Sequence, residues 1–360
     1  MPSVILKSRF VRPLYTCMVD KQCRKFLNRY LTDDVKHTLQ KEKIIHPYSK
    51  LHPWKSRESF SQYLLNNVIY NEDGLVAINK PYGISARKLL IANKTYSNTY
   101  SMVPNGVDYT LDDSLQFLAK ELGYAELIIV KTPEKFMSGV TILAANEKLQ
   151  DAIRTSYQRA IGMKLLNKTY WVVTLRVPNQ IKGREHLCIT VILFLPCLYR
   201  SHIPFYITIG EKWSRNAEKR REIKVLNVEF EIISNSTNNL SSFIEIKSST
   251  TKWHALRLFA STRLYTPILG DNLYGSRIQN IMGRWVLSFP ETNNDAPRMN
   301  SELLKILHLT KAKQELIPCH VHARSVILPN FKDTYLRLEA PLTSPFDWTC
   351  KQLKFKNIPL

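Results

Sequence analysis

A single carboxylate stands in a short loop between two apolar segments near the middle of the chain. Glu134 lies between Lys131 and Lys135, and the loop follows an apolar run from Leu127 to Val130. Ser138-Gly139 and a second apolar run come next. Two buried strands joined by a short loop are a common way to hold a reactive side chain rigidly at a sheet edge. The alternative is that Glu134 is an ordinary solvated loop charge.

The charge balance points to a polyanionic partner. The 360 residues include 51 Lys and Arg against 30 Asp and Glu, a net charge of +21. Such an excess favours nucleic acid, or an anionic membrane surface, as the partner. A basic mitochondrial or ribosome-associated protein with no RNA site of its own is the alternative. The 44% hydrophobic fraction supports a substantial core, and no apolar run is long enough to predict a membrane span.

Metal and disulfide chemistry are not indicated by the cysteines. The six cysteines are scattered, with no CxxC pair and no Cys/His cluster at metal-ligand spacing. We therefore expect free thiols in a reducing compartment and no metal site.

Composition divides the chain into three segments. Residues 1–20 are basic and hydroxyl-rich and contain no acid before Asp20, which predicts a mitochondrial presequence. Residues 21–58 form a basic N-terminal arm, with helical character at 26–40. Residues 59–353 are expected to form the globular domain, with an insertion at 180–219 that carries its own strands.

The pattern of apolar residues predicts more strands than helices. Helices are expected at 60–69, 111–122, 148–159 and 254–262, the second ending at Gly123 as a C-cap. Strands are expected at 74–78, 127–130, 140–143, 170–176, 225–233, 242–246, 320–328 and 334–338. Because strands and helices do not alternate regularly, we predict an α+β fold with a long, mixed, largely antiparallel sheet and flanking helices.

Five blocks match one pattern in order along the chain. They are GLVAINKPYG (74–83), Ser138-Gly139 with the strand after it, NKTYWVV (167–173), HALRLFAST…PILGDNLYG (254–275), and the tail HVHARSVILPN…LEAPL (320–342). This ordered set resembles the RluA-type RNA pseudouridine synthases from about Phe60 to Leu353. Within that family the chain is most similar to the mitochondrial members.

The resemblance implies a single catalytic domain with an RNA-binding cleft that isomerises uridine to pseudouridine without a cofactor. The family uses an aspartate in an HRLD-type motif before a Ser-Gly turn, and that aspartate falls on Glu134. The four motif positions read KTPE here, residues 131–134, so all four differ and only the last keeps a carboxylate.

Two further site residues follow from the resemblance. The uracil-stacking tyrosine falls on Tyr170, and the arginine that pairs with the catalytic carboxylate falls on Arg257. An aromatic face can receive a base that has left the RNA stack, and a cation can keep a buried carboxylate ionised. The alternatives are a core tyrosine and a helix-surface arginine. Residues expected to contact RNA are Lys131, Lys135, Lys168 and His254, and the structural turn spans Gly270, Asp271, Tyr274 and Gly275.

Two hypotheses follow. In the first, the chain is a matrix isomerase that uses Glu134, Tyr170 and Arg257 on mitochondrial rRNA or mRNA. In the second, it is a catalytically inactive RNA-binding or mitochondrial ribosome assembly factor, because glutamate reaches about 1.5 Å further than aspartate and Pro133 restricts the loop. A carboxylate directed towards Arg257 would favour the enzyme.

Overall fold

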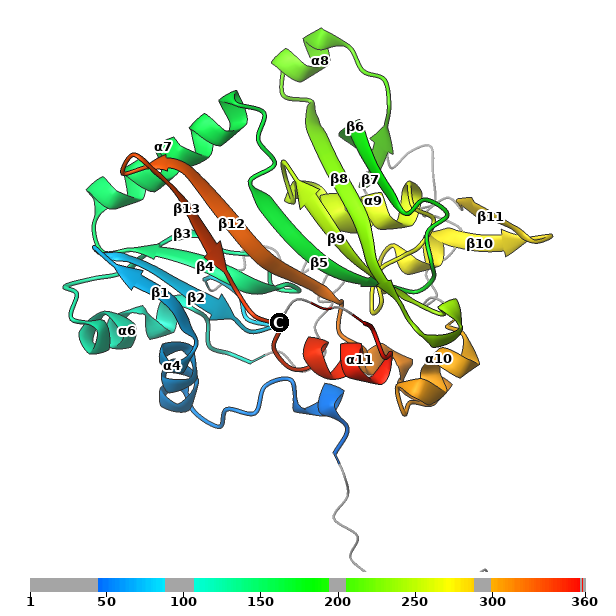
Figure 1. The fold of residues 1–360 in the computed structure, drawn as a ribbon, viewed down its shortest axis with the longest axis horizontal. Coiled ribbons are helices and arrows are strands. Elements are labelled where there is room, and N and C mark those ends of the chain that lie inside the picture. The colour runs from blue at the N-terminus through cyan, green and yellow to red at the C-terminus, as the bar shows by residue number, and fades with distance from the viewer. Residues whose placement is uncertain (1–44, 88–106, 194–204, 288–298, 357, 359–360) are drawn as a thin grey trace, which may run out of the picture. The chain divides into compact units, whose positions relative to one another are not determined.

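A mixed eleven-stranded sheet organises the residues that the computed structural model describes, which are 45–87, 107–193, 205–287, 299–356 and 358. Its strands run in the order β1-β2-β4-β12-β5-β9-β8-β6-β7, with β3 paired to β4 and β13 to β12 (Figure 1). They are β1 (Val68–Glu72), β2 (Leu75–Lys80), β3 (Ile128–Lys131), β4 (Ser138–Ala144), β5 (Lys168–Thr174), β6 (Lys182–Leu193), β7 (Phe205–Gly210), β8 (Ile223–Asn235), β9 (Ser242–Ser248), β12 (Val321–Phe331) and β13 (Thr334–Glu339).

The expected α+β class is confirmed. Among the described strands, β4 and β12 pair in parallel and the other pairs are antiparallel. The flanking helices are α4 (Arg57–Asn66), α6 (Leu115–Leu122), α7 (Glu147–Gly162), α8 (Arg215–Lys219), α9 (Ala255–Thr262), α10 (Ser301–Ile306) and α11 (Phe346–Gln352). Short 3-10 turns occur at Pro47–Lys50, Asp112–Ser114, Thr237–Asn239, Lys252–His254, Gly275–Arg277 and Lys311–Leu316.

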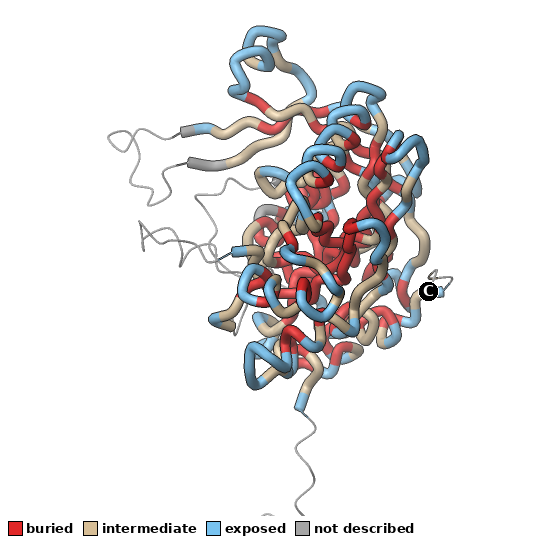
Figure 2. Tube along the Cα trace, turned by 90° about the vertical axis from the view of Figure 1, so that its left-hand side faces the viewer, coloured by how far each residue is buried: buried red, intermediate tan, exposed pale blue. Residues whose placement is uncertain are grey.

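Alternation along β5 divides the core between the two faces of the sheet. Tyr170 and Val172 join the cluster that α9 covers, whereas Trp171 and Val173 join the cluster that holds side chains of α10 and α11. Successive strand residues point to opposite faces, so β5 contributes to both layers. Figure 2 shows the buried residues concentrated along the central strands, with exposed residues on the outer turns.

Helix ends agree with local capping chemistry. Helix α6 ends at Gly123, whose φ of 77° places it in the left-handed region, as expected. The expected helix at 60–69 instead runs from Arg57 to Asn66, because Ser56 and Ser59 form a capping box at its start. After this helix, Val68 of β1 pairs with Ile78 of β2. Both residues are β-branched, which favours a strand.

Several elements were not predicted. Helices α10 and α11 and the separate hairpin β10 (Ile278–Ile281) and β11 (Arg284–Leu287) are short, and short elements leave weak periodic signals. Ser138-Gly139 was predicted as a turn, but these residues begin β4, between β2 and β12. Strands expected within 180–219 are present as β6 and β7, and they extend the main sheet through β8.

The compact unit spans Pro47–Leu360 and so includes residues 47–58, which were assigned to the basic arm. Tyr48 is fully buried, and its hydroxyl lies 2.8 Å from that of Thr349. The expected presequence and the expected helix at 26–40 lie outside the described residues. Across the described ranges, no helix has the length and apolarity needed to cross a membrane.

Gly139 is a point where the sheet admits no side chain. Its φ is +114°, and a Cβ there would stand 2.2 Å from the carbonyl oxygen of Ala323 in the parallel neighbour β12. The backbone on both sides belongs to the sheet and cannot withdraw cheaply. The residue after Ser138 must therefore be glycine for β4 to pass beside β12.

We predict that Gly139→Ala lowers the free energy of unfolding by about 3 kcal/mol or more, since it adds backbone strain and a clash. Urea unfolding followed by circular dichroism measures the change. Gly162→Ala is the matched control, because a Cβ at that exposed helix end meets nothing within 4 Å. Equal unfolding midpoints for the two variants would contradict the role assigned to Gly139.

Candidate active site

The loop that carries Glu134 is fixed at both ends. The hydroxyl of Thr132 lies 2.9 Å from the hydroxyl of Thr141 in β4. On the other side, Met137 donates its backbone N–H to the carbonyl of Glu134 at 2.9 Å. By the resemblance, Thr132 falls on the position of the motif arginine, and in this structure it anchors the loop.

Lys80 ties the loop to the turn after β2. Its ammonium group is buried and donates to the carbonyls of Met137 at 2.6 Å and Ile84 at 3.0 Å. In addition, Gly83 donates its N–H to the carbonyl of Lys135 at 2.9 Å. These contacts restrict the loop to one arrangement, which a reactive side chain needs.

Glu134 is half-buried and carries a strongly shifted carboxyl group. Burial raises its pKa to about 7, although Arg257 and Lys131 each act to lower it. Among the described residues its carboxylate has no hydrogen-bonding or salt-bridge partner. At neutral pH the group is therefore close to half-ionised, in contrast to a solvated loop glutamate.

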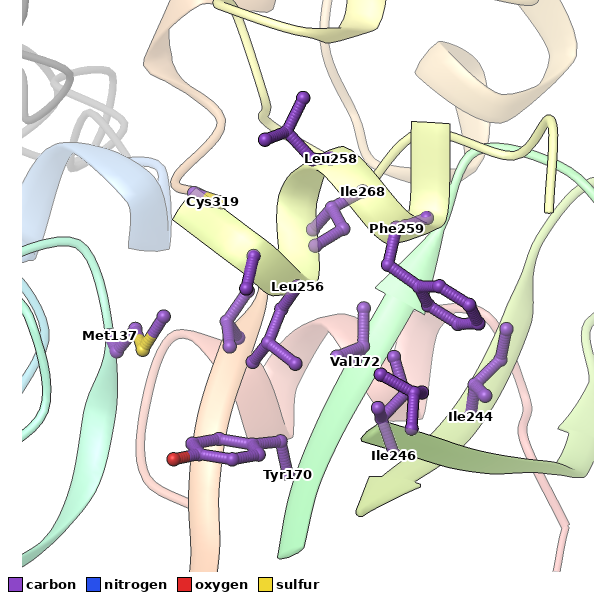
Figure 3. Close-up of a cluster of buried hydrophobic side chains, with 14 of the residues drawn as sticks. Met137, Tyr170, Val172, Ile244, Ile246, Leu256, Leu258, Phe259, Ile268 and Cys319 are labelled. Atoms are coloured by element: carbon purple, nitrogen blue, oxygen red, sulfur yellow. The ribbon is translucent and has the colours of Figure 1, made fainter. Parts of the chain in front are cut away.

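Tyr170 lies in the core beside this loop. Only 5% of its surface is exposed, and Figure 3 shows its ring below Leu256, with the hydroxyl directed to the side on which Met137 lies. Burial raises the pKa of the hydroxyl, as does the charge of Glu134 to a smaller extent, whereas the nearby side chain of Thr251 lowers it. Its ring faces other side chains in this structure, so stacking against a base requires them to move.

Arg257 is fully buried and is paired with Asp271. Its Nε donates to one carboxylate oxygen at 3.0 Å and its Nη2 contacts the other. The guanidinium carbon also lies 4.8 Å from the ring centre of Phe136, in the Glu134 loop. The expected direct pairing with Glu134 is therefore wrong in this structure: Asp271 takes the arginine, and Glu134 is affected through space.

The Asp271 turn holds this pair rigidly. One Asp271 oxygen also accepts the N–H groups of Leu273 and Tyr274, each at 3.0 Å. Gly270 has a φ of +80°, and a Cβ there would lie 2.1 Å from the carbonyl of Pro318. The GDNLYG segment is thus a structural turn, and it also supplies the arginine's counter-ion.

Of the four residues expected to contact RNA, two are close to Glu134 in the chain and two lie near its neighbours in the loop. Lys131 and Lys135 flank it in the loop, and Lys168 at the start of β5 lies within electrostatic reach of Lys131. His254 packs edge-on against Phe136, with ring centres 5.9 Å apart. Their roles in RNA binding remain predictions.

Three residues of the site were not assigned from the sequence. Lys80 stood only within the GLVAINKPYG block, Phe136 in the predicted loop, and Lys252 in no predicted element. Each acts through contacts with residues far away in the chain, as Lys80 does with Met137. Local spacing carries no signal for such contacts, so only the tertiary structure identifies them.

A surface hollow of about 280 Å³ lies over β6, β8 and β9. It is lined by Lys182, Gly183, Arg184, Glu229, Phe230, Glu231, Glu245 and Lys247. Its three carboxylates balance its three cations, so the hollow has no net charge that would attract a polyanion such as RNA. We therefore do not assign it as the RNA-binding cleft, and that cleft remains a prediction.

Known proteins similar to this chain are pseudouridine synthases. The human mitochondrial mRNA pseudouridine synthase RPUSD3 is 24% identical over 315 residues, which are 85% of this chain and 82% of the relative. The mouse mitochondrial pseudouridylate synthase RPUSD4 is 26% identical over 283 residues, 74% of this chain and 63% of the relative. No family model matches the chain.

A solved structure has the same fold. Human RNA Pseudouridylate Synthase Domain Containing 4 aligns with a TM-score of 0.60 at 22% identity, over 84% of this chain and 97% of that chain. The likeness agrees with the mixed sheet described above and with the ordered blocks in the sequence. In sequence and in fold the chain is similar to these pseudouridine synthases, which agrees with the resemblance of its ordered blocks to the RluA-type enzymes.

Proposed function

We propose that this chain isomerises uridine to pseudouridine in mitochondrial RNA, with Glu134 as the reactive carboxylate. The isomerisation breaks the bond between N1 of uracil and C1′ of ribose, joins C5 to C1′ and moves one proton from C5 to N1. Atoms and electrons balance without any co-reactant, so the proposal includes no cofactor. The observation that carries it is the desolvated Glu134 carboxyl beside a buried arginine, at the motif position of the family's aspartate.

Desolvation suits Glu134 to this role. A carboxylate in water is a weak nucleophile and a weak base, whereas one removed from water has a raised pKa and greater reactivity when ionised. The loop anchors limit its motion, and placement of the reacting group determines much of the rate. The extra methylene of glutamate is then accommodated by a loop built around it, with Thr132 held against Thr141.

Arg257 has one guanidinium nitrogen that its partner Asp271 does not use. Asp271 uses its Nε and Nη2, and its Nη1 is buried with no hydrogen-bond partner among the described residues. A buried guanidinium N–H without an acceptor is costly. We assign it to an acceptor that arrives with the substrate, either a uracil carbonyl or a Glu134 oxygen drawn closer on binding.

Tyr170 is proposed as the aromatic face for the displaced base. Because 5% of its surface is exposed, this role needs a rearrangement of the side chains above it when RNA binds. Base stacking on an aromatic ring gives about 1–3 kcal/mol, enough to drive a small local displacement.

The names of the relatives place them in mitochondria, which supports a mitochondrial location for this chain. Our proposal adds the matrix as the compartment and mitochondrial rRNA or mRNA as the substrate. A role as a silent RNA-binding or ribosome assembly factor is the second candidate. The KTPE sequence favours it, since all four motif positions are changed.

Pseudouridine mapping tests the proposal directly. Mitochondrial RNA from cells that lack the protein should lose pseudouridine at specific positions, and wild type should restore it. Glu134→Ala should restore RNA binding but not pseudouridine, because one loop carboxylate adds no attraction to phosphate. Restoration of the modification by Glu134→Ala would refute the assignment, and an unchanged map without the protein would favour the silent factor.

The raised pKa of Glu134 predicts a pH-dependent stability. Folding raises its pKa from an ordinary 4.5 to about 7, so the folded state binds the proton more tightly. The stability that it contributes is complete below about pH 4.5 and is lost as pH rises through about 7. Glu134→Gln should therefore unfold at a higher urea concentration than wild type at pH 8, and the two should converge near pH 5. The same difference at both pH values would contradict a buried carboxyl.

Removal of the arginine's partner should be far more damaging than removal of Glu134. Asp271→Ala leaves Arg257 charged and buried, so we expect a loss of about 3–5 kcal/mol in the free energy of unfolding. Asp347→Ala is the control, since its partner Lys351 is 70% exposed, and it should cost less than about 1 kcal/mol. Comparable losses from Asp271→Ala and Asp347→Ala in urea unfolding would show that the buried pair does not support the site.

A further inference from the structure

Three lysines from three elements lie within electrostatic reach of one another, and Lys131 among them also acts on Glu134. Lys131 ends β3, Lys168 begins β5, and Lys252 begins the 3-10 turn before α9. Each of them lies within electrostatic reach of the other two. Residues 131, 168 and 252 are distant in sequence, so the fold brings these charges together.

The charge of this lysine cluster is not neutralised. Within the described ranges none of the three forms a salt bridge, and the carboxylate that acts on Lys131 is Glu134, which is itself only partly ionised at neutral pH. Lys168 reaches a backbone carbonyl, that of Ser249, at 3.5 Å, and the ring of Tyr157 at 5.5 Å. Like charges held together without counter-ions create a local positive potential that attracts anions.

The effect of this crowding is visible in the ionisation of the lysines. Burial, together with the smaller effects of Lys131 and Lys252, lowers the pKa of Lys168 to about 8. The pKa of Lys131 is lowered by burial and by Lys252 in the same way. A bound anion would reverse the repulsive part of both shifts.

The surroundings connect the cluster with the candidate active site. The side chain of Thr251, next to Lys252, lies close enough to the hydroxyl of Tyr170 to lower its pKa, against the larger effect of burial. The hydroxyl of Tyr157, whose ring lies against Lys168, is buried and has no partner among the described residues. Lys131 and Lys252 are themselves exposed, so an anion can reach them from solvent.

We propose that Lys131, Lys168 and Lys252 bind one backbone phosphate of the RNA, next to the nucleotide whose base enters the site. This inference rests on the proposed function for its substrate, and it adds the position at which the substrate backbone is held. A phosphate there fixes the ribose relative to Glu134, and contacts with phosphate position a nucleic acid without reading its sequence. Free phosphate has the same chemistry, and the test separates the two sources.

The salt dependence of RNA binding tests the cluster. Binding of fluorescent oligouridylate to the full-length protein is measured by anisotropy over a series of KCl concentrations. Lys252→Ala should reduce the slope of log affinity against log salt by about 1, and Lys252→Arg should keep the wild-type slope. Lys305→Ala is the control, an exposed lysine on α10, whose neighbours Leu303 and Leu304 pack with Trp171 on the opposite face of β5.

Each outcome decides the matter. Equal slopes for Lys252→Ala and Lys305→Ala, or no binding of oligouridylate by any form, would overturn the phosphate site. Competition by sodium phosphate at constant ionic strength that exceeds competition by chloride, and that Lys252→Ala abolishes, would assign the site to free phosphate instead. A reduced slope in a protein that makes no pseudouridine would uphold the phosphate site while the proposed isomerase fails.

Discussion

The site depends on the burial of charged side chains, which loses their contact with water and must be offset by contacts within the protein. Arg257 and Asp271 are fully buried and face each other, within a turn whose N–H groups also bind the aspartate. The pairing holds the Arg257 guanidinium in place, and its charge acts to lower the pKa of Glu134 against the larger, opposite effect of burial.

The sheet makes this electrostatic arrangement possible. Strand β4 passes between β2 and β12 at Gly139, so the loop before β4 is brought to the middle of the sheet. Helix α9 then carries Arg257 across the same face as Tyr170. Three lysines act on one another here, and one of them, Lys131, also acts on Glu134. Because Glu134 is only partly ionised at neutral pH, it repels a nearby phosphate less than a fully charged carboxylate would.

The sequence predicted the parts of this arrangement that have local signals. Alternation in β5 and the glycine that ends α6 are local patterns, and the ordered blocks placed Glu134, Tyr170 and Arg257 in one fold. The sequence did not predict which groups form ion pairs. Arg257 pairs with Asp271 rather than with Glu134, and residue spacing does not encode the side-chain positions that decide this. Lys252 and Lys80 were missed for the same reason, and the near-complete burial of Tyr170 agrees with the alternative of a core tyrosine.

The most direct test of this account is a crystal structure of the Glu134→Ala variant with a uridine-containing RNA bound, since the variant should bind but not react. We predict one uracil out of the base stack, in contact with the ring of Tyr170 and facing position 134, with a carbonyl near Nη1 of Arg257. RNA bound on another surface, with Tyr170 still covered and no uracil within reach of residue 134, would contradict the assignment of this loop as the active site.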